Sequence, residues 1–350
     1  MYRLLIFGIA LMMVTISCSK NQKNIIVDEE YPVLNAKLTD VVLDENTLFP
    51  TDLYLLSDTI LVVNDSKNKD GFITFYDTNT QQPIAALGKI GDGPNDFINP
   101  RFLHNKTTDH DLYVGDAKKI VQFSVDSIRE MNYQGERVMS VPIEMMFYNY
   151  ILMDNDSVIV FSQTGEHPIS MLNKRKQELK VTDYYPDIQW DGGSGYIRNM
   201  EVFSNSMTSN SELIAIAYHN WNIISIVSLN GKPKNEIYLP EWDYNQQRMH
   251  IDPSTGNLIL DSDAKIFFTK IKSSREHIFA LGWSVTKEEI KNGDASSFIY
   301  VMDWEGNVKK KILFDRSVSN FCVYNETIPY VTALGDDGEI HVFKNELKTL

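Results

Sequence analysis

Short apolar runs separated by polar turns recur along almost the whole chain. Residues 60–63, 72–76 and 223–227 are rich in Val, Ile, Phe and Tyr, and clusters of Asn, Asp, Gly and Ser bound each run. Such runs predict β-strands. The best helix candidate is the capping-box sequence at residues 286–289, which allows only about two turns before Asn292 and Gly293. The pattern therefore predicts an all-β protein.

The strands form a repeat that can be traced six times. Each repeat contains an apolar strand, a loop and a second strand that often ends in Asp or Asn. The first strands begin near Ile60, Leu112, Val158, Leu213, Ile278 and Ile328. This spacing is close to the 40–50 residues or so of a four-stranded propeller blade, and it predicts a six-bladed β-propeller. We assign the longer interval after Leu213 to an insertion at residues 285–297, in the hairpin of the fifth blade.

The two ends of the chain are predicted to share the last blade. Residues 344–350 are enough for one short strand at most, and residues 37–43 precede the first repeat without belonging to it. An N-terminal strand that completes the last sheet would close the ring and remove an exposed edge. A β-sandwich would instead need strands about 8–12 residues apart without a superimposed repeat. We therefore favour the propeller.

The first residues are typical of a lipoprotein signal peptide. Arg3 precedes an uncharged apolar run at residues 4–14, and the small residue Ser17 stands directly before Cys18. The run is too short for a membrane helix, because a bilayer core is about 30 Å thick. A cleaved signal with an incidental cysteine is the other alternative. Thr15 departs from the usual pattern, which has leucine at that position.

This interpretation divides the chain into three parts. Residues 1–17 are the signal peptide, residues 18–30 contain the acylated Cys18 and a flexible tether, and residues 31–350 form a single β-propeller domain. Acyl chains on Cys18 would hold the protein at a membrane. We expect a location in the cell envelope.

Composition excludes several classes of partner and site. The formal net charge is −14 and no block rich in Lys or Arg offsets it, so nucleic acid is not an expected partner. The same balance disfavours adsorption on anionic lipids, leaving the lipid anchor as the attachment. Of the two cysteines, Cys18 is assigned to acylation, so Cys322 is predicted to be a buried, inert thiol.

A glycine-rich segment carries a resemblance to a known family. Residues 87–100 read LGKIGDGPNDFINP, and residues 299–307 read IYVMDWEGN. Both stretches resemble the TolB-like six-bladed β-propeller lipoproteins of Bacteroides-type bacteria, and with the signal peptide the likeness covers nearly the whole chain. The resemblance implies the fold and an outer-membrane location more than an activity. The insertion at residues 285–297 departs from the shorter hairpin expected in this family.

The glycine-rich segment is predicted to be architectural. Glycines can adopt backbone angles forbidden to other residues, proline fixes its own, and a phenylalanine can plug the passage between blades. The residues concerned are Gly88, Gly91, Gly93, Pro94 and Phe97. A phosphate-binding loop is the alternative. It lacks the Gly-Lys-Ser/Thr ending of a P-loop and no helix is evident after it.

Other candidate chemistry is weak. The histidines show no metal-ligand spacing, and the calcium-loop-like residues 64–71 contain two lysines and lack the acidic twelfth ligand. No metal, cofactor or catalytic residue is expected, since no nucleophile motif or outstanding carboxylate pair occurs. Tripeptides at residues 58–60, 126–128 and 156–158 resemble O-glycosylation acceptors of exported proteins, a minor hypothesis.

Two functional classes remain open. The first is a binding or scaffold module of the cell envelope that holds a glycan, peptide or protein partner, with no catalysis expected. The second is an envelope lyase or hydrolase with its site at the propeller channel, formed by residues scattered along the chain. Trp190 and Trp242 lie in polar, loop-like contexts and are the candidate ligand contacts, because exposed rings can stack on sugars or anchor a protein.

Overall fold

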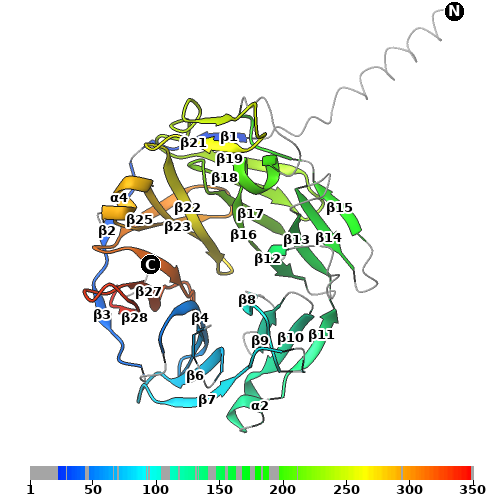
Figure 1. Cartoon of the computed structure of the whole chain (residues 1–350), viewed down its shortest axis with the longest axis vertical. Helices are drawn as coiled ribbons and strands as arrows, with labels where there is room; N and C mark the ends of the chain where they lie inside the picture. The colour runs from blue at the N-terminus through cyan, green and yellow to red at the C-terminus, as the bar shows by residue number, and fades with distance from the viewer. Residues whose placement is uncertain are drawn as a thin grey trace, which may run out of the picture.

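The computed structural model confirms the predicted six-bladed β-propeller. Six sheets surround a common centre, as Figure 1 shows. The structure describes residues 23–347 except 29, 44–46, 66, 69–70, 92, 94, 104–110, 117–118, 131, 133, 141–146, 154–156, 163–167, 174–177, 183, 189–196, 211 and 293–294.

The first three blades follow one another along the chain, each as an antiparallel four-stranded sheet. Blade 1 contains β4 (Pro50–Ser57), β5 (Ile60–Asp65), β6 (Ile73–Asp77) and β7 (Pro83–Leu87). Blade 2 contains β8 (Arg101–Leu103), β9 (Asp111–Gly115), β10 (Lys119–Ser124) and β11 (Glu136–Ser140), with the helix α2 (Val125–Arg129) after β10. Blade 3 contains β12 (Phe147–Leu152), β13 (Val158–Ser162), β14 (Ile169–Leu172) and β15 (Glu178–Thr182).

The last three blades each take a strand from the N-terminal segment. Blade 4 contains β16 (Asn205–Ser209), β17 (Leu213–Tyr218), β18 (Ile223–Ser228), β19 (Pro233–Tyr238) and β1 (Lys23–Ile26), and a π-helical turn at Arg198–Val202 precedes it. Blade 5 contains β22 (Lys265–Ser273), β23 (His277–Thr286), β24 (Phe298–Asp303), β25 (Val308–Leu313) and β2 (Val33–Asn35). Blade 6 contains β26 (Val318–Phe321), β27 (Tyr330–Leu334), β28 (Ile340–Asn345) and β3 (Leu38–Asp40).

The N-terminal segment closes the ring as predicted. β3 pairs antiparallel with β28, so that Phe343 lies opposite Asp40. β1 and β2 add parallel outer strands to β19 and β25. Figure 1 shows this blue segment along the outer rim of blades 4, 5 and 6. We call β1, β2 and β3 the N-terminal strap.

The strap begins earlier than the sequence suggested. The sequence predicts a flexible tether within residues 18–30, but residues 23–26 form β1, whose Ile25 lies opposite Ile237 of β19. Four residues with two polar side chains carry too weak a pattern to predict a strand. The open edge of β19 supplies the hydrogen-bonding partner that makes it one.

Six apolar clusters fill the six interfaces between neighbouring blades. Alternation along each central strand sends side chains to opposite faces of its sheet. Ile60 and Val62 of β5 therefore pack toward blade 2, whereas Leu61 and Val63 pack toward blade 6. This explains why the sequence shows continuous apolar runs here, since both faces of each sheet are buried.

The predicted helix is present, but the long repeat interval has another cause. Glu289 of α4 (Lys287–Asn292) accepts the Thr286 amide at 2.7 Å and donates its own amide to the Thr286 hydroxyl at 3.2 Å, which confirms the capping box. The interval after Leu213 is lengthened by a separate hairpin, β20 (Met249–Ile251) and β21 (Leu258–Leu260). The assignment of the extra length to residues 285–297 is wrong, because that segment follows Ile278 and so lies outside the interval. The β20–β21 hairpin was not recognised in the sequence because its strands have only three residues each.

Candidate functional site

The ring centre is formed by the first strand of every blade. Strands β26, β4, β8, β12, β16 and β22 contact one another in that order around the axis. Side chains from distant parts of the sequence therefore meet there. A propeller can collect a site from several blades in this way.

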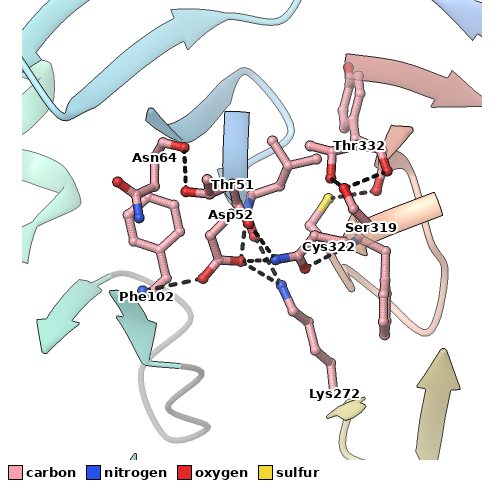
Figure 2. Close-up of polar contacts among 12 residues, drawn as sticks. Thr51, Asp52, Asn64, Phe102, Lys272, Ser319, Cys322 and Thr332 are labelled. Atoms are coloured by element: carbon pink, nitrogen blue, oxygen red, sulfur yellow. Dashed lines mark hydrogen bonds and ion pairs between the residues drawn. The ribbon is translucent and has the colours of Figure 1, made fainter. Parts of the chain in front are cut away.

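The carboxylate of Asp52 on β4 joins four blades. Its Oδ1 accepts hydrogen bonds at 3.0 Å from both the Lys272 ammonium of blade 5 and the Asn320 amide of blade 6. Its Oδ2 accepts the backbone amide of Phe102 in blade 2 at 3.3 Å. Figure 2 shows these contacts converging on the one side chain. The hydrogen-bonding capacity of the Asp52 carboxylate is thus extensively used by the protein.

Lys272 is held in place by several partners. Its side chain is only 4% exposed and that of Asp52 13%. The ammonium also donates to the Leu53 carbonyl at 3.3 Å and lies 5.5 Å from the ring centroid of Phe321. These contacts offset the desolvation of both charges, which is the condition for a buried ion pair to persist.

The rest of the polar contacts in Figure 2 are neutral. Asn320 donates to the Thr51 carbonyl at 2.8 Å, and the hydroxyls of Ser319 and Thr332 lie 2.8 Å apart. The free thiol of Cys322 is buried, and burial raises its pKa to about 12. The prediction of a buried thiol is therefore confirmed, and the raised pKa opposes formation of a thiolate nucleophile.

Two further cations belong to the same region. Lys270 of β22 is close enough to Asp52, to Lys272 and to Arg101 of β8 for the charges to interact, and burial together with Lys272 and Arg101 lowers the pKa of Lys270. We name Asp52, Lys272, Asn320, Lys270 and Arg101 the central cluster. Three of its members are basic and one is acidic. Its local balance is opposite to the net charge of the chain.

A second buried polar cluster lies between blades 3 and 4. Glu236 of β19 is fully buried, and burial raises the pKa of its carboxyl. The hydroxyls of Tyr184 and Tyr238 hydrogen-bond to it, and burial raises the pKa of both phenols. Tyr218 donates to the Ser225 hydroxyl at 3.3 Å nearby. We name Glu236, Tyr184, Tyr218 and Tyr238 the tyrosine cluster.

The glycine-rich segment is packed onto blade 2. Gly88 has φ +81°, and a Cβ there would lie 2.7 Å from the ring of Phe97, which is fully buried. Lys119 donates to the carbonyls of Gly93 and Asp96 and lies 4.9 Å from the Phe97 centroid. These contacts fit an architectural role, which stays a prediction.

Two amides of the same segment are held by blade 2 itself. The Asp116 carboxylate accepts the Ile98 amide at 3.0 Å and the Asn99 amide at 2.7 Å. Gly91 donates its amide to the Phe97 carbonyl at 3.4 Å. Backbone donors that a phosphate would need are therefore engaged within the protein. Pro94 lies outside the described residues.

The candidate tryptophan contacts and the lipid site are only partly within the described chain. Trp242 is half-buried, and its ring meets Tyr238 edge-on with centroids 4.9 Å apart. It packs on the apolar cluster between blades 3 and 4. Trp190 and Cys18 lie outside the described residues. A ligand contact by Trp242 stays a prediction.

The described histidines do not converge. His277 pairs with Glu326 at 2.8 Å, His341 pairs with Asp337 at 2.9 Å, and the half-buried His219 contacts the Phe268 carbonyl. Within the part of the chain that the structure describes, no group of three His, Cys, Asp or Glu residues could hold a metal ion. His104, His110 and His167 lie outside it.

In the calcium-loop-like segment at residues 64–71, an acidic side chain hydrogen-bonds to backbone amides. The Asp65 carboxylate accepts the amides of Leu48 at 2.6 Å, Phe49 at 2.8 Å and Lys67 at 2.8 Å. Its oxygens thereby connect β5 to the entry of its own blade. Other residues of the segment, among them Asp70, lie outside the described chain.

A surface cleft at blade 6 is the other concave candidate. It has a volume of about 500 Å³ and is lined partly by residues 40–43 beside the strap and by the turn before β28. Four of its titratable side chains are already paired, because His341 meets Asp337 at 2.9 Å and Arg316 lies 3.9 Å from Asp336. This pairing makes it a weaker candidate than the central cluster.

Sequence reasoning missed the central cluster. Asp52 lies 220 residues before Lys272 and 268 before Asn320 along the chain, and no motif surrounds any of them. The one available signal was the pair Lys270 and Lys272, two lysines at strand spacing within an otherwise apolar run. Such a pair marks one face of a buried strand as polar.

The comparisons with known proteins give a family and a fold. The TolB-like 6-blade propeller-like family matches residues 34–326. A member of the DUF4221 family from Bacteroides vulgatus has 11% identity and a TM-score of 0.59, covering 90% of this chain and 99% of its own. A protein from Bacteroides fragilis, named as a candidate exported protein, has 9% identity and a TM-score of 0.56, covering 94% and 100%. At these identities the likeness shows the fold alone. No curated protein matches the chain significantly.

Proposed function

We propose, from the premise that this chain belongs to the TolB-like six-bladed β-propeller family, that it is a lipid-anchored binding module of the cell envelope. It holds a glycan, peptide or protein partner and performs no catalysis on it. One observation carries the proposal: charged side chains from blades 1, 2 and 5 meet at the ring centre. The propeller fold is a rigid frame on which side chains from several blades can form one binding surface.

Rigidity of the ring supports binding. Each interface between blades is filled by its own apolar cluster, and the Asp52 carboxylate adds contacts to three other blades. A frame fixed in this way presents side chains to a ligand without a large ordering cost. The thiol of Cys322, which lies in the same region, has a raised pKa, and this disfavours its use as a nucleophile.

The N-terminal sequence supports the anchor. An apolar run at residues 4–14 and Ser17 before Cys18 fit a lipoprotein signal, and acyl chains on the cysteine would attach the protein to the outer membrane. Among the residues that the structure describes, no helix is long and apolar enough to cross a membrane. The similarity to a candidate exported protein agrees with an envelope location.

Binding is tested with the full chain purified in detergent. The protein is immobilised and incubated with fractionated envelope glycans and peptides, while retention and product formation are both measured. We expect a retained and chemically unchanged component. Arg101→Ala should weaken retention, whereas Arg275→Ala, which alters an exposed arginine in the β22–β23 turn, should not. Product formation that Arg101→Ala abolishes would instead establish an envelope lyase or hydrolase.

The anchor is tested by Cys18→Ser. The wild-type protein is expected to partition into the detergent phase, and the variant into the aqueous phase, because the thiol that carries the acyl chains is gone. Metabolic labelling with a fatty acid measures acylation directly. Equal detergent partitioning of the two proteins would refute the lipid anchor and leave the binding proposal standing.

A further inference from the structure

Strand β22 presents two lysines on the same face. Its pairing with β23 is regular from Lys270 opposite Leu281 to Lys272 opposite Phe279. Residues two apart in a strand point to the same side of the sheet. Since the Lys272 ammonium reaches Asp52 of blade 1, Lys270 faces the ring centre as well.

Only one of the two lysines has a counter-ion. Asp52 already accepts hydrogen bonds from Lys272, Asn320 and the Phe102 amide. Among the described residues, Lys270 forms no hydrogen bond or ion pair, and burial lowers its pKa. The side chain nonetheless keeps part of its surface open to solvent. The position is therefore not sealed from solvent.

Basic side chains outnumber acidic ones in the central cluster. The charges of Lys272 and Arg101 act on Lys270, and Asp52 is the carboxylate that acts on it. A cation that has lost water without gaining a hydrogen-bonding partner is expensive, and the Asp52 charge offsets only part of this cost, because burial still lowers the pKa of Lys270. The chain has 47 acidic and 33 basic residues, so basic side chains gathered here do not follow from composition.

We propose that the ring centre binds an oxyanion, a carboxylate or phosphate group, through the ammonium of Lys270 with the charges of Lys272 and Arg101 behind it. This inference rests on the proposed binding function and names the chemistry of its ligand. Lysine binds either oxyanion as a point charge. An acidic sugar and a phosphorylated one would both supply it.

The test uses isothermal titration of the full chain in detergent at low ionic strength. Inorganic phosphate and glucuronate are the two probes, and glucose is the neutral reference. We expect at least one anion to bind and glucose not to bind. The tighter of the two anions identifies which oxyanion the site prefers.

Variants assign the binding to Lys270. Lys270→Met should weaken the anion at least about tenfold, since a charged hydrogen-bond donor is removed. Lys270→Arg should retain binding within about threefold. Lys232→Met, which removes an equal charge from an exposed turn of blade 4, should leave the affinity unchanged.

Thermal unfolding gives a second readout that does not depend on affinity. Without anion, Lys270→Met should have an unfolding midpoint equal to or above that of the wild type, because an unpaired buried cation is gone. With anion, only proteins that bind should gain stability. A variant with a normal midpoint and no anion-dependent gain supports the site.

Failure of this inference is distinguishable from failure of the proposed function. Equal anion affinity in Lys270→Met and the wild type, or no binding of either anion by the wild type, overturns the oxyanion site. Retention of an envelope component by Lys270→Met at the wild-type level would then leave the binding module intact. Anion binding by a wild-type protein that retains no envelope component would overturn the binding module alone.

Discussion

The central cluster and the tyrosine cluster solve the same problem differently. Both bury a carboxyl group in an otherwise apolar ring. Asp52 meets an ammonium, a side-chain amide and a backbone amide from three other blades. Glu236 meets phenolic hydroxyls, and burial raises the pKa of its carboxyl. One carboxyl group is thus paired with a cation, whereas burial among phenols favours the protonated form of the other.

The difference teaches where charge is useful in this molecule. The charged pair of Asp52 and Lys272 occurs where blades meet at the centre. It connects strands that no sheet hydrogen bond joins. Glu236 and its phenolic partners lie inside one interface between blades, where apolar side chains already hold the two blades together. The charges at the ring centre also act on Lys270, whereas the described residues place no such group of charges around the tyrosine cluster.

Removing the Asp52 carboxylate should be the most damaging change. Asp52→Ala leaves the buried Lys272 ammonium and the Asn320 amide without their acceptor. We expect a loss of about 3–5 kcal/mol in the free energy of unfolding, which urea titration measures. Asp58→Ala, an exposed position in the following turn, should change it by less than about 0.5 kcal/mol. Equal losses of unfolding free energy in the two variants would show that the Asp52 carboxylate does not stabilise the ring.

Replacing both partners should recover most of that loss. Asp52→Leu combined with Lys272→Met removes the unpaired charge as well as the pair, and apolar replacements of a buried ion pair are often neutral or stabilising. We expect the double variant to lie within about 1 kcal/mol of the wild type by the same urea titration. A double variant as unstable as Asp52→Ala would show that the hydrogen bonds, not the uncompensated cation, dominate.

The tyrosine cluster should respond to pH in a defined direction. Because the pKa of Glu236 is raised, the folded protein holds its proton at pH values where the unfolded chain has lost it. Wild-type stability therefore falls as pH rises from the ordinary glutamate value through the raised one.

Glu236→Gln removes this titration. Relative to the wild type, its free energy of unfolding should increase with pH, reaching a gain of about 1 kcal/mol at pH 8. Urea titrations at pH 4.5 and 8 measure the difference, and Glu212→Gln, an exposed position in the same blade, is the matched control. A gain that shrinks with pH would contradict the protonated assignment.

The fold was predictable because its strands are buried on both faces. Runs such as residues 60–63 and 223–227 are apolar throughout, and their regular recurrence determines the number of blades. The capping box of α4 was also readable, since its two hydrogen bonds join residues three apart. These signals are local, and local signals survive without knowledge of the tertiary structure.

The central cluster was not predictable for the opposite reason. Asp52 and Lys272 are 220 residues apart in sequence, and each is an ordinary charged residue in its own segment. The two residues come together only because the blades form a ring, and the sequence indicates that ring only through its repeat. β1 escaped prediction likewise, because its stability comes from the edge of β19 and not from its own four residues.

The strap has a consequence for the order in which the chain can be assembled. Strands β1 to β3 are synthesised before any blade, yet their partners lie in the last three blades, and Thr39 bonds to Glu346 at a separation of 307 residues. The loop-closure entropy of such a contact grows slowly with length, but contacts this distant form slowly. We therefore expect the residues that are synthesised first to close the ring last. Until then the edges of three sheets stay open to pairing with other chains.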